Sequence, residues 1–482
     1  MRVRRCRASA QTDSLTVVLD LSGLAPSVAE ALEHTLQLPA ARDGSSMLEQ
    51  APQVFTRRCR ESASELAGSD AGDAIEFATI ISAFVHECRH VHDLRSTRMG
   101  AELLLHDLQA YAGVGALLDR LAEWQAAHPD RSIPLPLVGE LDIFTGEFDD
   151  IATTLRRSLA IRDQVWRWWR TRSQRPFLPG HSLMDMFEFV AFATQVDWLA
   201  GVLGPEVADV VSAAILADDH QITTYGRPGI VMAHLAARHG NSFEPDQQDA
   251  SRLFWSALNA NGIEETVYNG RATDHHAGTW FGLFLERLFN PADRPTIPAG
   301  LDSAWAAEVV LELHGVPGPK ERYDAAVQAL EKLQDSTMRS HMVGYKPILI
   351  ESMLIESEVA IDYRHMNRLI LSRPEYHIPQ TYVDLLISGE LPTVHVRATG
   401  RDGTQGDFRT PSWIPSNHVG GPRAASKASQ QMRLLLEGRD TAMQPYPAAV
   451  YAELRAPRPE GRGLRFRTGM PAPKRRLGPL KQ

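Results

Sequence analysis

The sequence predicts a mainly α-helical protein with a minor β contribution. The first observation behind this prediction is composition: aromatic residues make up 7% of the chain, and Leu, Ala, Val and Ile dominate the 43% that are hydrophobic. The second is that many stretches repeat apolar residues at the helical period, with capping or breaking residues at their ends. At 482 residues the chain is long enough to bury a sizeable core.

The strongest helix is predicted to begin near Asp73. Glu76 follows at the spacing of a capping box, with Asp in place of Ser or Thr. The next residues are apolar on nearly every face of the helix up to Val85. A helix of this kind is typical of a protein centre, where every face is covered.

A second very apolar helix is predicted after Ser182, which caps it together with Asp185. Two segments, 14–23 and 392–400, instead alternate like short strands. The segment 165–175 interleaves aromatic and arginine side chains, which is typical of an amphipathic helix with buried tryptophans and solvated arginines.

Three parts of the chain are distinguished by composition. Residues 1–13 are expected to be disordered, and 441–482 form a tail rich in Pro, Gly and Arg that is also expected to be disordered. Between them, 14–440 is the helical body. It divides into two expected lobes, a metal-site lobe over about 14–205 and a second lobe over about 206–440.

The charge distribution indicates which kinds of partner the protein is expected to bind. The net charge is −9, yet from Arg455 onward there are nine Lys or Arg and a single acid. Nucleic-acid binding by the acidic body is not expected, because phosphate contacts need clustered cations. The basic tail suits an acidic partner, or it is simply a solvated terminus.

The expected cellular compartment is predicted from the cysteine content and from targeting and membrane-spanning signals. The three cysteines are too few and too odd in number for a disulfide framework. The basic start has no apolar segment behind it, and no run of 18 apolar residues occurs. We therefore expect a cytoplasmic protein without a membrane span.

The stretch "HECRH" contains the strongest candidates for functional residues in the sequence. His86 and His90 are four residues apart, so on a helix both imidazoles leave the same face one turn apart. That spacing lets both bind one Zn²⁺ ion. Glu87 points about 100° away from His86. It can thus lie beside an open coordination position and act as general base toward a metal-activated water.

A catalytic zinc site needs a third protein ligand. Glu188 is the leading candidate, because it is the only ionisable residue between Met186 and Gln195 and a carboxylate in an apolar helix is costly unless paired, protonated or metal-bound. Gln195 lies on nearly the same face and is a candidate hydrogen-bond partner. Glu102, twelve residues past His90, is the alternative third ligand.

Two further residues extend the polar patch. Arg89 is expected either to neutralise a neighbouring acid, to hold a substrate carboxylate, or to pair with Glu188. Asp93, seven residues from His86, is expected either to orient a liganding imidazole or to reach solvent at the end of the helix.

"HECRH" together with a distant helix-borne glutamate resembles the zincin metallopeptidases, in the glutamate-liganded (gluzincin) arrangement. The resemblance covers two short helical stretches. It implies one zinc ion held by His86, His90 and a glutamate, Glu87 as general base, and hydrolysis of peptide bonds.

The sequence is compatible with three functions. The favoured one is a zinc-dependent hydrolase, in particular a metallopeptidase acting on a peptide or protein. The second is a non-enzymatic helical interaction protein with a structural or vestigial metal site. The third is a di-iron carboxylate protein, for which Glu87-x-x-His90 supplies one motif and Asp362-x-x-His365 only a variant of the other.

Overall fold

The computed structural model confirms the mainly α-helical prediction. It describes residues 8–11, 16–20, 24–36, 51–95, 97–135, 147–172, 180–217, 222, 224–238, 247–263, 266, 276–289, 302–318, 321, 325, 394–397 and 466–468. The helices are α1 (Pro26–Leu36), α2 (Ala51–Ser69), α3 (Ala71–Arg95), α4 (Arg98–Ala127), α5 (Glu147–Arg170), α6 (Leu183–Leu203), α7 (Pro205–Ile215), α9 (Arg227–Arg238), α10 (Gln247–Ala260), α12 (Ala277–Phe289) and α13 (Asp302–Leu313).

The β contribution consists of two small sheets. In the first, β2 (Thr16–Asp20) pairs antiparallel with β1 (Ala8–Gln11) and parallel with β4 (Val394–Arg397). In the second, β3 (Ile133–Leu135) pairs parallel with β5 (Phe466–Thr468). The strands predicted within 14–23 and 392–400 are therefore confirmed.

Strands β1 and β5 fall within the terminal stretches that the sequence predicts to be disordered. Strand β1 pairs with β2 and β5 pairs with β3, and this pairing supplies backbone hydrogen bonds that a short isolated segment lacks. The other residues of 1–13 and 441–482 lie outside the described part of the chain. The division of the body into two lobes stays a prediction.

Helix α3 is buried as predicted, but it begins slightly earlier. The Asp70 side chain accepts a hydrogen bond from the Gly72 amide at 2.7 Å and so caps the helix. Asp73, the predicted start, instead accepts from the Ser27 hydroxyl of α1 at 2.6 Å. Phe77 and Phe84 are among the buried residues of this helix.

Helix α6 begins as the sequence predicts. The Ser182 hydroxyl accepts from the Asp185 amide, and the Asp185 carboxylate accepts from the Ser182 amide, which completes a capping box. By length and composition alone α6 would suffice to cross a membrane, and 56% of its most apolar window is buried within the protein. Core helices pass the same test, so this is weak evidence of a span.

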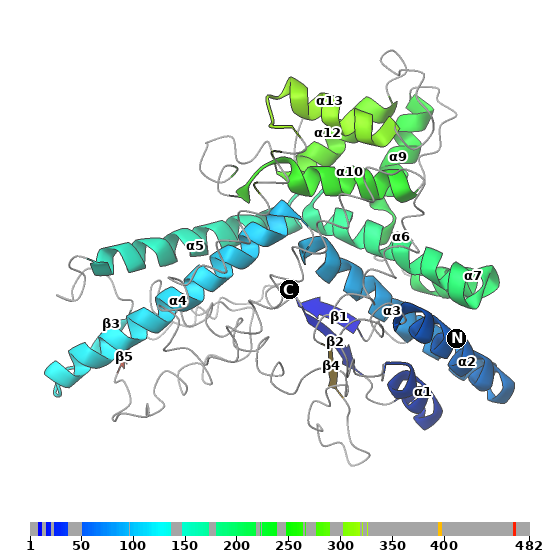
Figure 1. The fold of residues 1–482 in the computed structure, drawn as a ribbon, viewed down its shortest axis with the longest axis horizontal. Helices are drawn as coiled ribbons and strands as arrows, with labels where there is room; N and C mark the ends of the chain where they lie inside the picture. The colour runs from blue at the N-terminus through cyan, green and yellow to red at the C-terminus, as the bar shows by residue number, and fades with distance from the viewer. Residues whose placement is uncertain are drawn as a thin grey trace, which may run out of the picture.

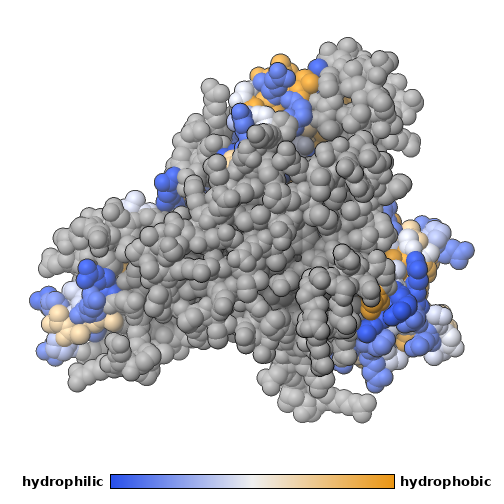
Figure 2. All heavy atoms as spheres, in the orientation of Figure 1, coloured by the Kyte–Doolittle hydropathy of each residue, from blue (hydrophilic) through white to orange (hydrophobic). Residues whose placement is uncertain are grey.

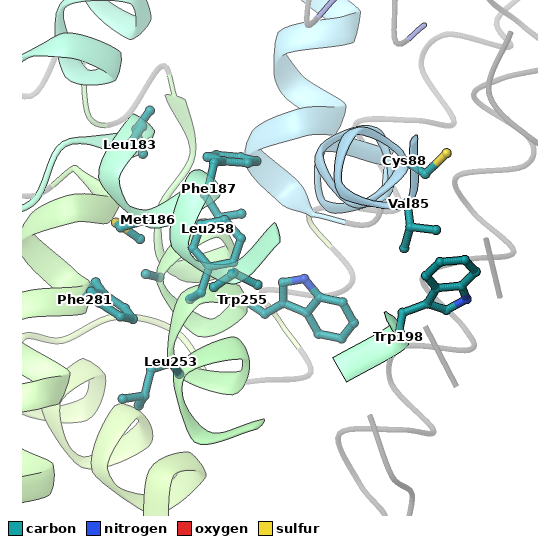
Figure 3. Close-up of a cluster of buried hydrophobic side chains, with 14 of the residues drawn as sticks. Val85, Cys88, Leu183, Met186, Phe187, Trp198, Leu253, Trp255, Leu258 and Phe281 are labelled. Carbon is teal, nitrogen blue, oxygen red and sulfur yellow. The ribbon is translucent and has the colours of Figure 1, made fainter. Parts of the chain in front are cut away.

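The helices meet around α6. Figure 1 shows α3 and α6 lying alongside each other from the centre outward, with the group α9, α10, α12 and α13 on one side of α6 and the long pair α4 and α5 extending away in another direction. Figure 3 shows the core between these helices, with Phe187 of α6 beside Leu258 and Trp255 of α10. On the face in Figure 2, hydrophilic and hydrophobic side chains mix over the described ends of α2 and α7.

Candidate metal centre

Three predicted ligands, His86, His90 and Glu188, converge where α3 packs against α6. The His86 Nε2 atom lies 3.1 Å from Glu188 Oε2 and 3.1 Å from His90 Nε2. His90 Nε2 lies 3.7 Å from Glu188 Oε1. One donor atom from each residue can be chosen so that all three lie within 4.8 Å of one another.

These distances suit a small metal ion. Two donors each about 2.0–2.1 Å from a tetrahedral ion are separated by roughly 3.3 Å. The His86 Nε2 atom is 3.1 Å from both His90 Nε2 and Glu188 Oε2, slightly below that value, and the other Glu188 oxygen is 3.7 Å from His90 Nε2, slightly above it. Two imidazoles and one carboxylate are also a common donor set for a metal with an open fourth position. This group could therefore hold a metal ion.

The cluster reaches solvent on one side. The side chains of His86 and His90 are 5% and 6% exposed, whereas that of Glu188 is 21% exposed. Access to the donors is consequently from the face of α6 that carries Glu188.

Packing fixes the two imidazole rings. The ring of His86 lies edge-on against Tyr225, with 5.6 Å between centroids, and that of His90 packs against Phe187 at 6.0 Å. Because the two Nε2 atoms are 3.1 Å apart, one must donate to the other when no cation binds both. The Nδ1 atoms of both rings are buried and have no hydrogen-bond partner among the described residues.

The electrostatics of the cluster favour its charged forms. Burial lowers the pKa of His90, but the Glu188 carboxylate, together with the charges of Glu87 and Asp93, outweighs burial and raises this pKa above its ordinary value. Burial raises the pKa of the Glu188 carboxyl, but the charge on His90 and the hydrogen bond from His86 hold it well below its usual range. A carboxylate thus faces two imidazoles, and a metal ion that binds them must displace the proton held between these groups.

Glu87, the predicted general base, is near this group. It follows His86 in α3 and is 8% exposed. Its negative charge contributes to the raised pKa of His90, as does that of Asp93. The carboxylate therefore lies within electrostatic reach of the cluster without being one of its three donors.

Arg89 and Asp93 form a separate buried network. The Arg89 Nε atom donates to both Asp93 oxygens at 2.8 Å, and the Trp255 Nε1 atom donates to Asp93 at 2.7 Å. Arg89 also donates to the Thr194 hydroxyl at 3.0 Å, and its guanidinium lies 5.6 Å from the centre of the Trp255 ring.

This network corrects the roles suggested for the two residues. Both side chains are 0% exposed, so Arg89 does not reach a substrate carboxylate and Asp93 does not reach solvent. Arg89 forms an ion pair with Asp93, so it neutralises that acid. Asp93 accepts from Arg89 and Trp255, so it holds Arg89 in place instead of orienting an imidazole.

Gln195 and Glu102 also have other partners than those suggested. The Gln195 amide donates to the Ser82 hydroxyl of α3 at 2.9 Å. Glu102 accepts from Arg98 at 2.8 Å and from the Ile263 amide. Glu102 is thus part of the contact between α4 and the end of α10, and it is not a member of the donor group.

The residues that sequence reasoning missed come from distant segments. Trp255 of α10 completes the Arg89–Asp93 network, and Tyr225 covers His86. No spacing relates either residue to "HECRH". Asp362 and His365, the variant second motif of the di-iron alternative, lie outside the described residues.

The case for a metal centre rests on the geometry of His86, His90 and Glu188 within this chain. No protein-family model, curated protein or solved structure matches the chain.

Proposed function

We propose that this protein is a metal-dependent hydrolase, with zinc as the metal and an amide bond of a peptide or protein as the target. The observation that supports it most is the convergence of His86, His90 and Glu188: His86 Nε2 lies 3.1 Å from both His90 Nε2 and one Glu188 oxygen, and Glu188 is partly exposed. A purely structural zinc site is usually closed by four protein ligands. Three donors among the described residues leave one position for water or substrate.

Zinc is proposed because neutral imidazole and carboxylate suit it and because catalytic zinc sites use two histidines and a glutamate. The same donor set also serves non-haem iron(II). Metal analysis of the purified protein distinguishes the two ions.

Each residue has a defined task in this proposal. When bound, zinc polarises a substrate carbonyl and lowers the pKa of a bound water to about 7. His86, His90 and Glu188 hold the ion. Glu87 accepts the proton from the attacking water and passes it to the leaving amine. Its burial beside His90 shields that proton transfer from bulk solvent.

The resemblance to gluzincins also supports this proposal. The donor set is the one that the resemblance implies, with the glutamate supplied by a second helix. The non-enzymatic alternative shares the metal and differs only in turnover. It is favoured by the low exposure of both imidazoles, 5% and 6%, which restricts the room for substrate.

The first experiment is metal analysis of the purified protein after dialysis against trace zinc. Wild type should retain one zinc per chain, and Glu188→Ala should lose most of it. Glu102→Gln is the matched control, since this glutamate was the competing candidate and is bonded elsewhere. Wild type without stoichiometric metal would overturn the proposal.

The second experiment separates catalysis from binding. Glu87→Gln should keep the metal and lose hydrolysis of a fluorogenic peptide mixture by about 10²-fold or more, the usual contribution of a general base. Metal-loaded wild type without hydrolysis of any peptide in the mixture would favour the non-enzymatic alternative.

A further inference from the structure

The exposed side of the metal cluster is lined by apolar side chains. Met184 and Phe192 lie one turn before and one turn after Glu188 on α6, and both are partly exposed. The neighbours of Glu188 on this face are therefore apolar. A helix face that meets water usually carries polar residues. Glu188 is therefore reached across an apolar surface.

Two aromatic rings form the part of this surface next to the donors. Phe192 lies one turn after Glu188, and its ring stacks on that of Tyr225 with 5.2 Å between centroids and 20° between planes. Tyr225 in turn lies edge-on against His86. The aromatic pair thus continues directly from a metal ligand.

Exposure distinguishes this pair from Phe187, the aromatic ring that packs against His90. Phe187 is 0% exposed and packs edge-on against Phe254 in the core. Phe192 and Tyr225 are both partly exposed. Part of their ring surface remains in water, and covering it with another apolar group is favourable.

We propose that Phe192 and Tyr225 form the binding site for an apolar, preferably aromatic, side chain of the substrate. This inference rests on the proposed hydrolase function. A substrate whose carbonyl reaches the His86–His90–Glu188 group would place a neighbouring side chain against the aromatic pair. The substrate class is accordingly a peptide with a large apolar residue beside the bond that is cut, in preference to one with glycine or a charged residue there.

Hydroxamates test this preference without turnover. Phenylalanine hydroxamate and glycine hydroxamate share the metal-binding group and differ in the side chain, and their affinities for the zinc-loaded protein are measured by calorimetry. Wild type should bind phenylalanine hydroxamate about 10-fold or more tightly than glycine hydroxamate, as expected for stacking and burial of one ring. Equal affinities would overturn the inference and leave the hydrolase proposal standing.

Variants of Phe192 and Tyr225 test whether these two rings cause the preference for phenylalanine hydroxamate. Phe192→Ala should remove most of it while metal content stays at the wild-type level, and Tyr225→Phe, which keeps the ring, should retain it. Leu313→Ala, a truncation of an apolar residue that is 74% exposed on α13, is the matched control and should change nothing. A Phe192→Ala protein with the full preference would overturn the inference.

Two results separate this inference from the function on which it rests. If Phe192→Ala loses metal, the comparison is made in Phe192→Leu, where loss of the ring alone must still weaken the preference for phenylalanine hydroxamate. If neither hydroxamate binds zinc-loaded wild type, the cluster has no open coordination position. The hydrolase proposal then fails, and the aromatic site fails with it.

Discussion

Helix α3 carries two buried polar groups one turn apart, and they differ in how their charges are matched. The Arg89–Asp93 pair brings one cation to one carboxylate, with Thr194 and Trp255 as further partners. The His86–His90–Glu188 cluster brings two imidazoles to one carboxylate and leaves both Nδ1 atoms without a partner among the described residues.

The difference indicates which group is structural. The pair is closed, with both side chains 0% exposed, and it connects α3 to α6 and α10. The cluster has a partly exposed carboxylate and donor separations near those of a bound metal. The Arg89–Asp93 pair is already neutral, so binding a metal ion would not stabilise it. The converging donors of the cluster, in contrast, would be stabilised by a bound metal ion.

The largest expected effect comes from breaking the closed pair. Asp93→Ala leaves the Arg89 guanidinium buried without its counter-ion, so we expect a loss of about 3–5 kcal/mol in the free energy of unfolding. Urea denaturation followed by circular dichroism measures it. A loss below about 1 kcal/mol would mean that Arg89 reaches water and that the pair is not closed.

The double variant Arg89→Met with Asp93→Leu is the control for this prediction. Replacing both partners of a buried ion pair by apolar residues is often close to neutral. Recovery of most of the lost free energy would assign the cost to the unpaired charge and not to lost packing. The double variant also shows whether the metal cluster needs its neighbouring pair, since metal content can be measured in the same protein.

His181 provides a second contrast, between a histidine with a carboxylate partner and one without. The Glu188 carboxylate raises the pKa of His90, whereas burial lowers the pKa of His181 from its ordinary value of 6.5 to about 4. Neither ring nitrogen of His181 has a hydrogen-bond partner among the described residues. Its ring packs edge-on against Phe281 at 5.3 Å instead.

The sign of the resulting pH dependence follows from the two pKa values of His181. Below pH 6.5 the unfolded chain binds a proton that the folded protein does not take up until about pH 4. Stability is therefore lost as the pH falls from 6.5 to 4, by up to about 3 kcal/mol.

Urea titrations at several pH values compare wild type with His181→Phe, which keeps a ring against Phe281. The difference in unfolding free energy between the two proteins should change across pH 6.5–4 and be constant below it. Parallel profiles for the two proteins would contradict the prediction.

The sequence was sufficient to predict what local patterns determine. Residues four apart on one helix share a face whatever surrounds them, which is why His86 and His90 meet. Glu188 could be selected because an unpaired acid in an apolar helix requires a partner. The Ser182 capping box is likewise complete within four residues.

The partners of Arg89, Asp93 and Gln195 could not be predicted in the same way. The Trp255 donor to Asp93 is 162 residues away, and Ser82 is 113 residues from Gln195. Such contacts depend on how α3, α6 and α10 pack, which helical periodicity does not determine. Each of these polar residues had several candidate partners, and tertiary packing chose among them.

The smallest expected effect is the stabilisation of the folded protein by zinc bound at the cluster. A ligand that binds only the folded protein stabilises it by about 2.7 kcal/mol at 100 times its dissociation constant. Added zinc should therefore raise the unfolding free energy of wild type by about this amount at that concentration. It should do nothing for His86→Ala, which lacks one donor.

His234→Ala controls for metal bound at the surface, because His234 is an exposed histidine of α9. This variant should be stabilised by zinc as much as wild type. If zinc stabilises His86→Ala as much as wild type, the metal binds elsewhere. The cluster would then be a structural polar group like the Arg89–Asp93 pair. The Arg89–Asp93 pair is satisfied by protein groups alone, so its contribution should be the same with and without zinc, whereas that of the cluster should depend on zinc.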